Sequence, residues 1–165
     1  MKIFFHSGTQ EFEFSRLLDF AISYSKKNVN FLVTYQGYLR KNNFINRDKT
    51  NIEIVRFINK KKFEKLIFES DVVVCHSGTG AIFNSINLGH KPYVLPRLTK
   101  FNEHNDNHQL ELYNFLLAEN LILSLPCEEV LKSTKDSSCK TLGRKIFNGK
   151  LKKVLINEIE AICKQ

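Results

Sequence analysis

Short apolar runs alternate with helix-like segments along this chain, and this alternation constrains the fold more than any other feature. The predicted strands are residues 2–5, 29–35, 52–58, 71–75, 92–96 and 121–125. Helical spacing of apolar residues predicts helices over about 13–27, 60–70, 80–89 and 107–120. Because the strands are nearly all apolar, both faces of their sheet are expected to be covered. The pattern predicts an α/β fold with a doubly wound (Rossmann-like) parallel sheet of about six strands.

Length and composition narrow the classes of protein. A chain of 165 residues favours one domain over 1–165. The net charge of +8 favours an anionic partner, such as nucleic acid, an anionic membrane or a phosphorylated small molecule, although a solvated lysine-rich surface explains it equally well. The four cysteines form no CxxC pair, so they indicate neither a zinc site nor a disulfide framework, and they fit a reducing cytoplasm.

Membrane attachment is expected to be indirect. The apolar stretch at the N-terminus is too short for a signal peptide, and no apolar run reaches the roughly 18 residues of a membrane span. A cytoplasmic location, peripheral to the membrane through a partner, is therefore expected. The last forty residues predict two helices, of which about 140–165 forms an amphipathic basic helix. That helix could pack on its own sheet, dock on a partner or rest on an anionic membrane.

The tetrapeptide HSGT occurs twice, at residues 6–9 and 76–79, and each copy follows a predicted strand. In the common strand order 3-2-1-4-5-6, strands 1 and 4 are neighbours, and the crevice at their carboxyl ends is the usual ligand site. Glycine lets the backbone approach a ligand closely, and the start of a helix attracts phosphate. The paired turns predict a phosphate-bearing ligand, with two tight turns and no ligand as the alternative.

The chain resembles the donor-binding, C-terminal half of the MurG-type family 28 glycosyltransferases, which is one half of a GT-B fold. The resemblance covers about residues 1–125 and is most specific over 71–112, "DVVVCHSGTGAIFNSINLGHKPYVLPRLTKFNEHNDNHQLEL". The chain is similar to the stand-alone form of this domain. That form is seen in PssE-like bacterial exopolysaccharide subunits and in the small subunit of the eukaryotic two-subunit UDP-GlcNAc transferase of N-glycosylation. The loop 96–109 looks closest to the bacterial group.

The resemblance implies roles for particular residues. The two glycine turns would cradle the diphosphate of a UDP-sugar, and the backbone at 57–58 would face the uracil. Asn84 stands where MurG-type enzymes have a ribose-binding glutamate, and the loop 106–109 would reach the sugar hydroxyls. The predicted substrate-binding residues are Gly8, Thr9, Gln10, Phe57, Ile58, His76, Ser77, Gly78, Thr79, Gly80, Asn84, Asp106, His108 and Gln109.

No metal or other cofactor is expected. No DxD motif occurs, so helix N-termini and backbone N–H groups rather than Mg²⁺ or Mn²⁺ would stabilise the departing UDP. His104 and His108 with Asp106 also allow a zinc interpretation, but there is no HExxH motif, and a sugar-binding loop is preferred. The general base is not identified, and it is expected on a partner subunit.

The leading hypothesis is the donor-binding subunit of a two-component, metal-independent, inverting glycosyltransferase. It would add a sugar to a lipid-linked acceptor in capsule or exopolysaccharide biosynthesis, with a membrane-anchored partner that holds the acceptor. The alternatives are a sugar-nucleotide epimerase-like enzyme, which would need a second domain, and a non-enzymatic nucleotide- or RNA-binding module, which would need basic-aromatic patches. A receiver domain is excluded, because it needs acidic residues after strand 1 and this chain has HSGT there. The transferred sugar, the acceptor and the oligomeric state stay open.

Overall fold

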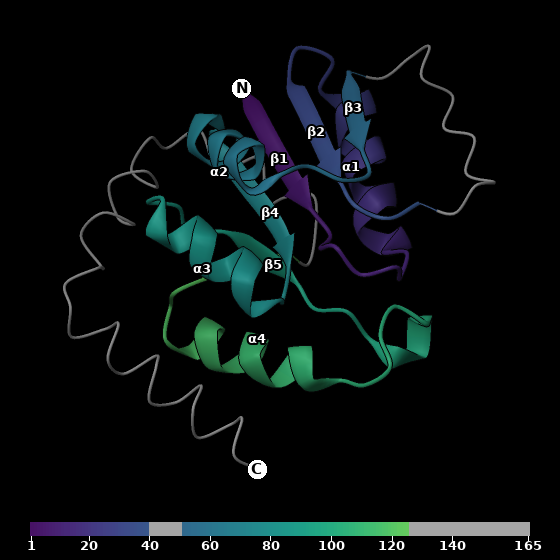
Figure 1. Ribbon diagram of the computed structural model, residues 1–165, viewed down its shortest axis with the longest axis vertical. Coiled ribbons are helices and arrows are strands. Elements are labelled where there is room, and N and C mark those ends of the chain that lie inside the picture. Colours follow the sequence, from purple (N-terminus) through teal and green to yellow (C-terminus); the bar gives the residue numbers. More distant parts are fainter. Residues whose placement is uncertain (40–50, 126–165) are drawn as a thin grey trace.

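The computed structural model describes residues 1–39 and 51–125, and it shows the predicted parallel sheet (Figure 1). The strand order is β3-β2-β1-β4-β5-β6, and every pairing is parallel. The strands are β1 (Lys2–His6), β2 (Leu32–Gln36), β3 (Ile52–Val55), β4 (Val72–His76), β5 (Tyr93–Leu95) and β6 (Leu123–Ser124). The doubly wound α/β prediction is therefore confirmed, including the adjacency of β1 and β4.

Helices cover both faces of the sheet, as the apolar strands require. The α-helices are α1 (Ser15–Lys27), α2 (Lys60–Glu69), α3 (Thr79–Asn87) and α4 (His108–Ala118), and a short 3₁₀ helix spans Thr99–Phe101. Figure 1 shows α1 behind the sheet and α2 and α3 in front of it. Among the described residues, no helix combines the length and the apolar character that crossing a membrane requires.

The strand side chains alternate between two apolar layers. Ile3 and Phe5 of β1 pack with α1, whereas Phe4, between them, packs with α2 through Ile67 and Phe63. The same alternation continues in β4, where Val74 joins the α1 layer and Cys75 joins the layer made by α3 and α4. Burial raises the pKa of the Cys75 thiol, so this cysteine is a protonated core residue.

The element boundaries differ from the prediction in one place that matters for the site. The third strand was expected to run over 52–58, but β3 ends at Val55, where its partner β2 also ends at Gln36. Phe57 and Ile58 are therefore outside the sheet and free to face solvent or a ligand. Residues 40–50 and the predicted C-terminal helix at about 140–165 lie outside the described residues.

Candidate functional site

A cavity of about 470 Å³ opens at the carboxyl ends of the strands, with His6 at the end of β1 and His76 at the end of β4 among its lining residues. This volume falls in the range of about 300–1,000 Å³ typical of small-molecule sites. It lies at the point where the winding of the sheet reverses, which is the expected place for a ligand in this fold. The lining residues are His6, Gly8, Thr9, Gln10, Gln36, Phe57, Ile58, Lys60, Phe63, His76, Gly78, Gly80, Ala81, Asn84, His104, His108 and Gln109.

The two HSGT turns meet at a single imidazole, that of His76. Gly8 has a φ of +93°, in the left-handed region, and a Cβ there would lie 3.0 Å from the His76 ring. A Cβ on Gly78 would lie only 2.2 Å from Nε2 of the same ring. The ring therefore fits against the bare backbone of both turns, so neither turn could carry a larger residue at these positions without moving it.

Gly80 differs from the other two turn glycines. It is in the first turn of α3 and has no positive φ, and a Cβ added there would meet nothing within 4 Å. Its missing side chain leaves open space in the cavity, beside the first backbone N–H groups of α3. These N–H groups have no partner within the helix, and they attract an anion.

The two histidines at the strand ends, His6 and His76, are uncharged; His6 is buried and His76 is half-buried. The Gln36 amide donates to the carbonyls of Arg56 (3.0 Å) and Gly8 (3.4 Å), so its Oε1 accepts from Nδ1–H of His6. Burial lowers the pKa of His6 to about 4, and burial also holds the pKa of His76 well below its usual value. The two rings contact each other edge to face, with centroids 5.4 Å apart.

Two buried polar atoms of the second turn lack a partner. Within the described part of the chain, Oγ of Ser77 and Nδ1 of His76 make no hydrogen bond, whereas Oγ of Ser7 in the first turn faces the buried hydroxyl of Tyr35. Such atoms mark places where a polar ligand or an ordered water completes the bonding. Lys60 is the only lysine or arginine among the described lining residues, so the cavity meets an anion mainly with backbone N–H groups and neutral rings.

The segment between β3 and α2 forms an apolar side of the cavity. Phe57 is 74% exposed, and Ile58 lies beside it. The Asn59 side chain caps α2 by accepting from the backbone N–H of Lys62 at 2.8 Å, which fixes the start of the helix next to Phe63. Asn84 lines the same cavity from α3.

A buried arginine joins the first turn to the loop after β5. The Arg97 side chain donates to the carbonyls of Ser7 (2.5 Å), Phe12 (3.0 Å) and Glu103 (2.8 Å), and it is 1% exposed. Arg16 donates to the Glu103 carboxylate through two nitrogens, at 2.8 and 2.5 Å. Arg16, which the sequence places near the first turn, is thus paired in this network and does not line the cavity.

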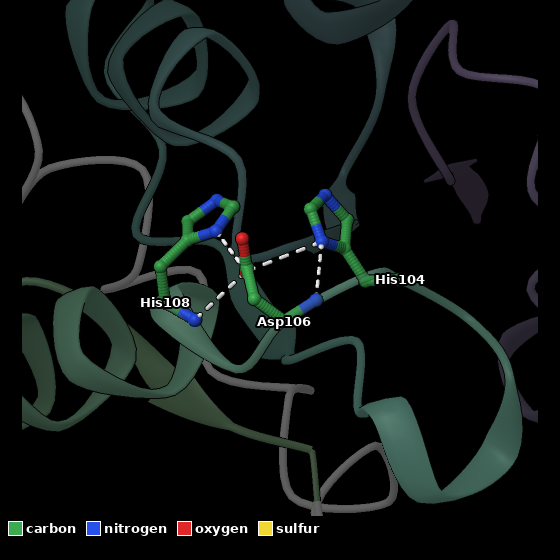
Figure 2. Close-up of side chains that lie close together, drawn as sticks. All are labelled: His104, Asp106 and His108. Atoms are coloured by element: carbon green, nitrogen blue, oxygen red, sulfur yellow. Dashed lines mark hydrogen bonds and ion pairs between the residues drawn. The ribbon is translucent and has the colours of Figure 1, made fainter.

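The segment 104–109 contributes His104 from the loop before α4, and His108 and Gln109 from the first turn of α4, to the lining. Gln109 is buried, and its Oε1 accepts from the backbone N–H of Arg97 at 3.3 Å. Figure 2 shows the exposed Asp106 carboxylate between the rings of His104 and His108. Backbone and side-chain hydrogen bonds from His108 hold the pKa of Asp106 below its usual value, so this carboxylate is ionised.

The cavity brings together most, but not all, of the residues that the sequence predicted for binding. Those that line it are Gly8, Thr9, Gln10, Phe57, Ile58, His76, Gly78, Gly80, Asn84, His108 and Gln109. Ser77 is buried, Thr79 is exposed and Asp106 is exposed, and none of these three is in the lining. The lining also includes residues that were not predicted, namely His6, Gln36, Lys60, Phe63, Ala81 and His104. The repeat itself pointed to His6, because His6 occupies the position of His76 in the first HSGT.

Comparison with known proteins gives a family and a fold. Residues 2–135 match the model of the glycosyltransferase family 28 C-terminal domain. The crystal structure of the glycosyltransferase SnogD from Streptomyces nogalater is similar, with a TM-score of 0.60 and 14% sequence identity. The similarity covers 88% of this chain and 38% of that chain, and at this identity it shows the fold alone. Among curated proteins, none matches the sequence.

Proposed function

Because the chain belongs to the glycosyltransferase family 28 C-terminal domain family, we propose that its cavity binds the sugar-nucleotide donor of a glycosyl transfer, a UDP-sugar. The Rossmann-like sheet is consistent with one half of a GT-B fold. The observation that carries the proposal is the meeting of two glycine turns at His76, next to the start of α3. This arrangement offers unpaired backbone N–H groups to a diphosphate and leaves open space at Gly80 for it.

The remaining parts of the donor follow from the walls of the cavity. The exposed Phe57 and Ile58 offer an apolar surface for the uracil, and Asn84 can hydrogen-bond a ribose hydroxyl. His108 and Gln109 lie on the loop assigned to the sugar. Since the Gln109 side chain already supports Arg97, its amide N–H groups rather than its oxygen are available to the sugar.

The proposed reaction is an inverting transfer without a metal at the diphosphate. The acceptor hydroxyl oxygen forms a bond to the anomeric carbon, and the bond from that carbon to the β-phosphate oxygen breaks on the opposite side. The electron pair leaves with UDP, whose growing negative charge is stabilised by the backbone N–H groups of the turns. The hydroxyl proton passes to a base that we assign to the acceptor-binding half of the enzyme.

We further propose that this acceptor-binding half is a separate, membrane-attached subunit and that the acceptor is a lipid-linked saccharide. The resemblance of the loop 96–109 to stand-alone donor subunits of exopolysaccharide synthesis supports this arrangement. The net charge of +8 is favourable next to anionic lipid headgroups.

Calorimetric titration of UDP in the presence of EDTA tests the donor site. We expect UDP to bind, and Gly80→Leu to weaken binding at least about tenfold, because the new side chain enters the cavity where nothing else opposes it. Leucine is also a better helix former than glycine, so this variant stays folded. Asn87→Leu is the matched control, since Asn87 is exposed on the same helix outside the cavity lining. Equal UDP affinity in the wild-type protein and Gly80→Leu would exclude the site.

A further inference from the structure

We propose that His104, Asp106 and His108 form a binding site for a divalent transition-metal ion of the zinc class. The three residues alternate along the loop that enters α4, and one potential ligand atom from each lies within 4.8 Å of the others. Figure 2 shows both imidazole rings directed at the Asp106 carboxylate from opposite sides. Nδ1 of His108 hydrogen-bonds Oδ1 of Asp106, and Nδ1 of His104 lies 3.3 Å from the same oxygen.

The contact between His104 and Asp106 places two potential ligand atoms of the site close together. The backbone N–H of Asp106 donates to Nδ1 of His104 at 3.4 Å, so this nitrogen presents a lone pair rather than a proton. The same nitrogen lies 3.3 Å from Oδ1 of Asp106. A cation bound at this point would take the Nδ1 lone pair from this long hydrogen bond and would also contact Oδ1 of Asp106.

The ring of His104 has little freedom to escape this contact. Its side chain is only 8% exposed, and it stacks near Phe12 with a centroid distance of 5.8 Å. His108, by contrast, is 60% exposed, and its backbone N–H also donates to Oδ1 of Asp106 at 3.1 Å. The backbone thus positions the carboxylate while one ring is held by packing.

The spacing and the donor types indicate which ion the site would take. Two ligands of one tetrahedral zinc ion, each about 2.0–2.1 Å from the metal, lie about 3.4 Å apart, close to the separation of the His104 and Asp106 atoms. Two imidazoles and one carboxylate suit zinc and its neighbours, whereas magnesium and calcium prefer oxygen ligands throughout. The fourth position would be open to water or a ligand, since His104 and His108 both line the cavity.

This inference departs from the preference for a metal-free sugar-binding loop that the sequence suggested. In the linear sequence the three residues only share a polar loop, and their convergence depends on the turn that the chain makes before α4. The inference does not rest on the proposed function: His108 is shared with the wall assigned to the sugar, but the turns assigned to the phosphates consist of other residues.

Competition titration with a chromophoric chelator, using zinc chloride and the full-length protein under reducing conditions, tests the site. We expect one equivalent of zinc to bind, and His108→Ala and Asp106→Asn to weaken its affinity at least about tenfold each. His104→Phe should do the same while it keeps a ring against Phe12. The matched control is Asn105→Ala, which changes the same loop between two of the proposed ligands and should leave zinc affinity unchanged.

Binding of Co²⁺ separates this site from the cysteines of the chain. We expect a visible spectrum of nitrogen and oxygen ligation with no thiolate charge-transfer band. Absence of zinc binding, or binding that survives all three ligand variants, would overturn the proposal. Because UDP binding is measured with EDTA present, failure of the metal site and failure of the donor site are distinguishable results.

Discussion

At the scale of single residues, the chemistry of the cavity depends on two histidines that stay neutral. Burial lowers the pKa of His6 to about 4 and holds that of His76 well below its usual value. A neutral imidazole can accept one hydrogen bond and donate another, but with a lowered pKa it is a weak base. Neither is therefore suited to be the general base of a transfer near neutral pH, which agrees with our assignment of the base to the acceptor half.

The same burial predicts how stability depends on pH. The folded-state pKa of His6, about 4, lies below the unfolded value of 6.5. Between these two values, the unfolded chain therefore binds more protons than the folded chain. We expect the free energy of unfolding to fall as pH decreases from about 6.5 toward 4, with a slope approaching about 1.4 kcal/mol per pH unit for each such histidine. Urea titrations between pH 7.5 and 5.5 measure this slope before most carboxylates contribute.

His6→Asn is the control for that prediction. The asparagine amide can still donate to Gln36, but it does not titrate, so the slope should decrease by the share of one histidine. A slope that is unchanged in His6→Asn would show that His6 does not resist protonation in the folded protein.

The sequence located the turns but could not say which of their side chains face the cavity. Ser77 and Gly80 were both predicted to bind substrate; Ser77 is buried and outside the cavity lining, whereas Gly80 borders open space within it. The orientation of each residue depends on the backbone direction of the turn, which the close fit of Gly78 against His76 determines. Packing between segments seventy residues apart cannot be read from local sequence.

At the scale of secondary-structure elements, Arg97 connects the first glycine turn to the loop after β5. Arg97→Met removes the donors for the carbonyls of Ser7, Phe12 and Glu103 while it keeps most of the side-chain volume. We expect the free energy of unfolding to decrease by about 3 kcal/mol or more, since several buried acceptors lose their partners. Chemical denaturation measures this loss.

Lys60→Met is the matched control for Arg97→Met. This variant also replaces a cation by methionine, but at an exposed position. We expect its free energy of unfolding to change by no more than about 0.5 kcal/mol. If Arg97→Met were as mild as Lys60→Met, the buried guanidinium would not hold the loops together.

The sequence predicted the elements well and their connections poorly. Apolar runs predicted every strand, because strands buried on both faces must be apolar throughout. Their ends were less accurate: Phe57 and Ile58 look like a continuation of β3 but lie beyond the last residue that β2 can pair. Arg97 gave no signal, because a buried arginine is stabilised by carbonyls that only the folded chain brings to it.

At the scale of the whole molecule, the order of the strands could be predicted because alternating strands and helices allow few topologies. That order by itself predicts that both turns lie at one crevice. The sequence allowed a zinc interpretation of His104, Asp106 and His108 but preferred a sugar-binding loop, because the distances between their ligand atoms depend on the path of the chain before α4.

The two-component proposal predicts the activity of the isolated chain. We expect no sugar transfer to a lipid-linked acceptor when the chain is incubated alone with radiolabelled UDP-glucose, UDP-galactose, UDP-glucuronic acid or UDP-GlcNAc. Co-expression with a membrane-anchored subunit encoded beside it should restore transfer of one of these sugars into the lipid extract. Gly80→Leu in the same complex should abolish the signal. Efficient transfer by the chain alone would refute the need for a second subunit.

The pairing of β1 with β4 also links folding to ligand binding. The register pairs Ile3 with Val72 and His6 with Cys75. The two turns therefore lie together at the cavity only while the hydrogen bonds between β1 and β4 are intact. A ligand that bridges the turns would bind only closed molecules, and it would therefore oppose local opening of the centre of the sheet by mass action. Amide hydrogens of β1 and β4 would then exchange with solvent as a single unit, and more slowly as the ligand concentration increases.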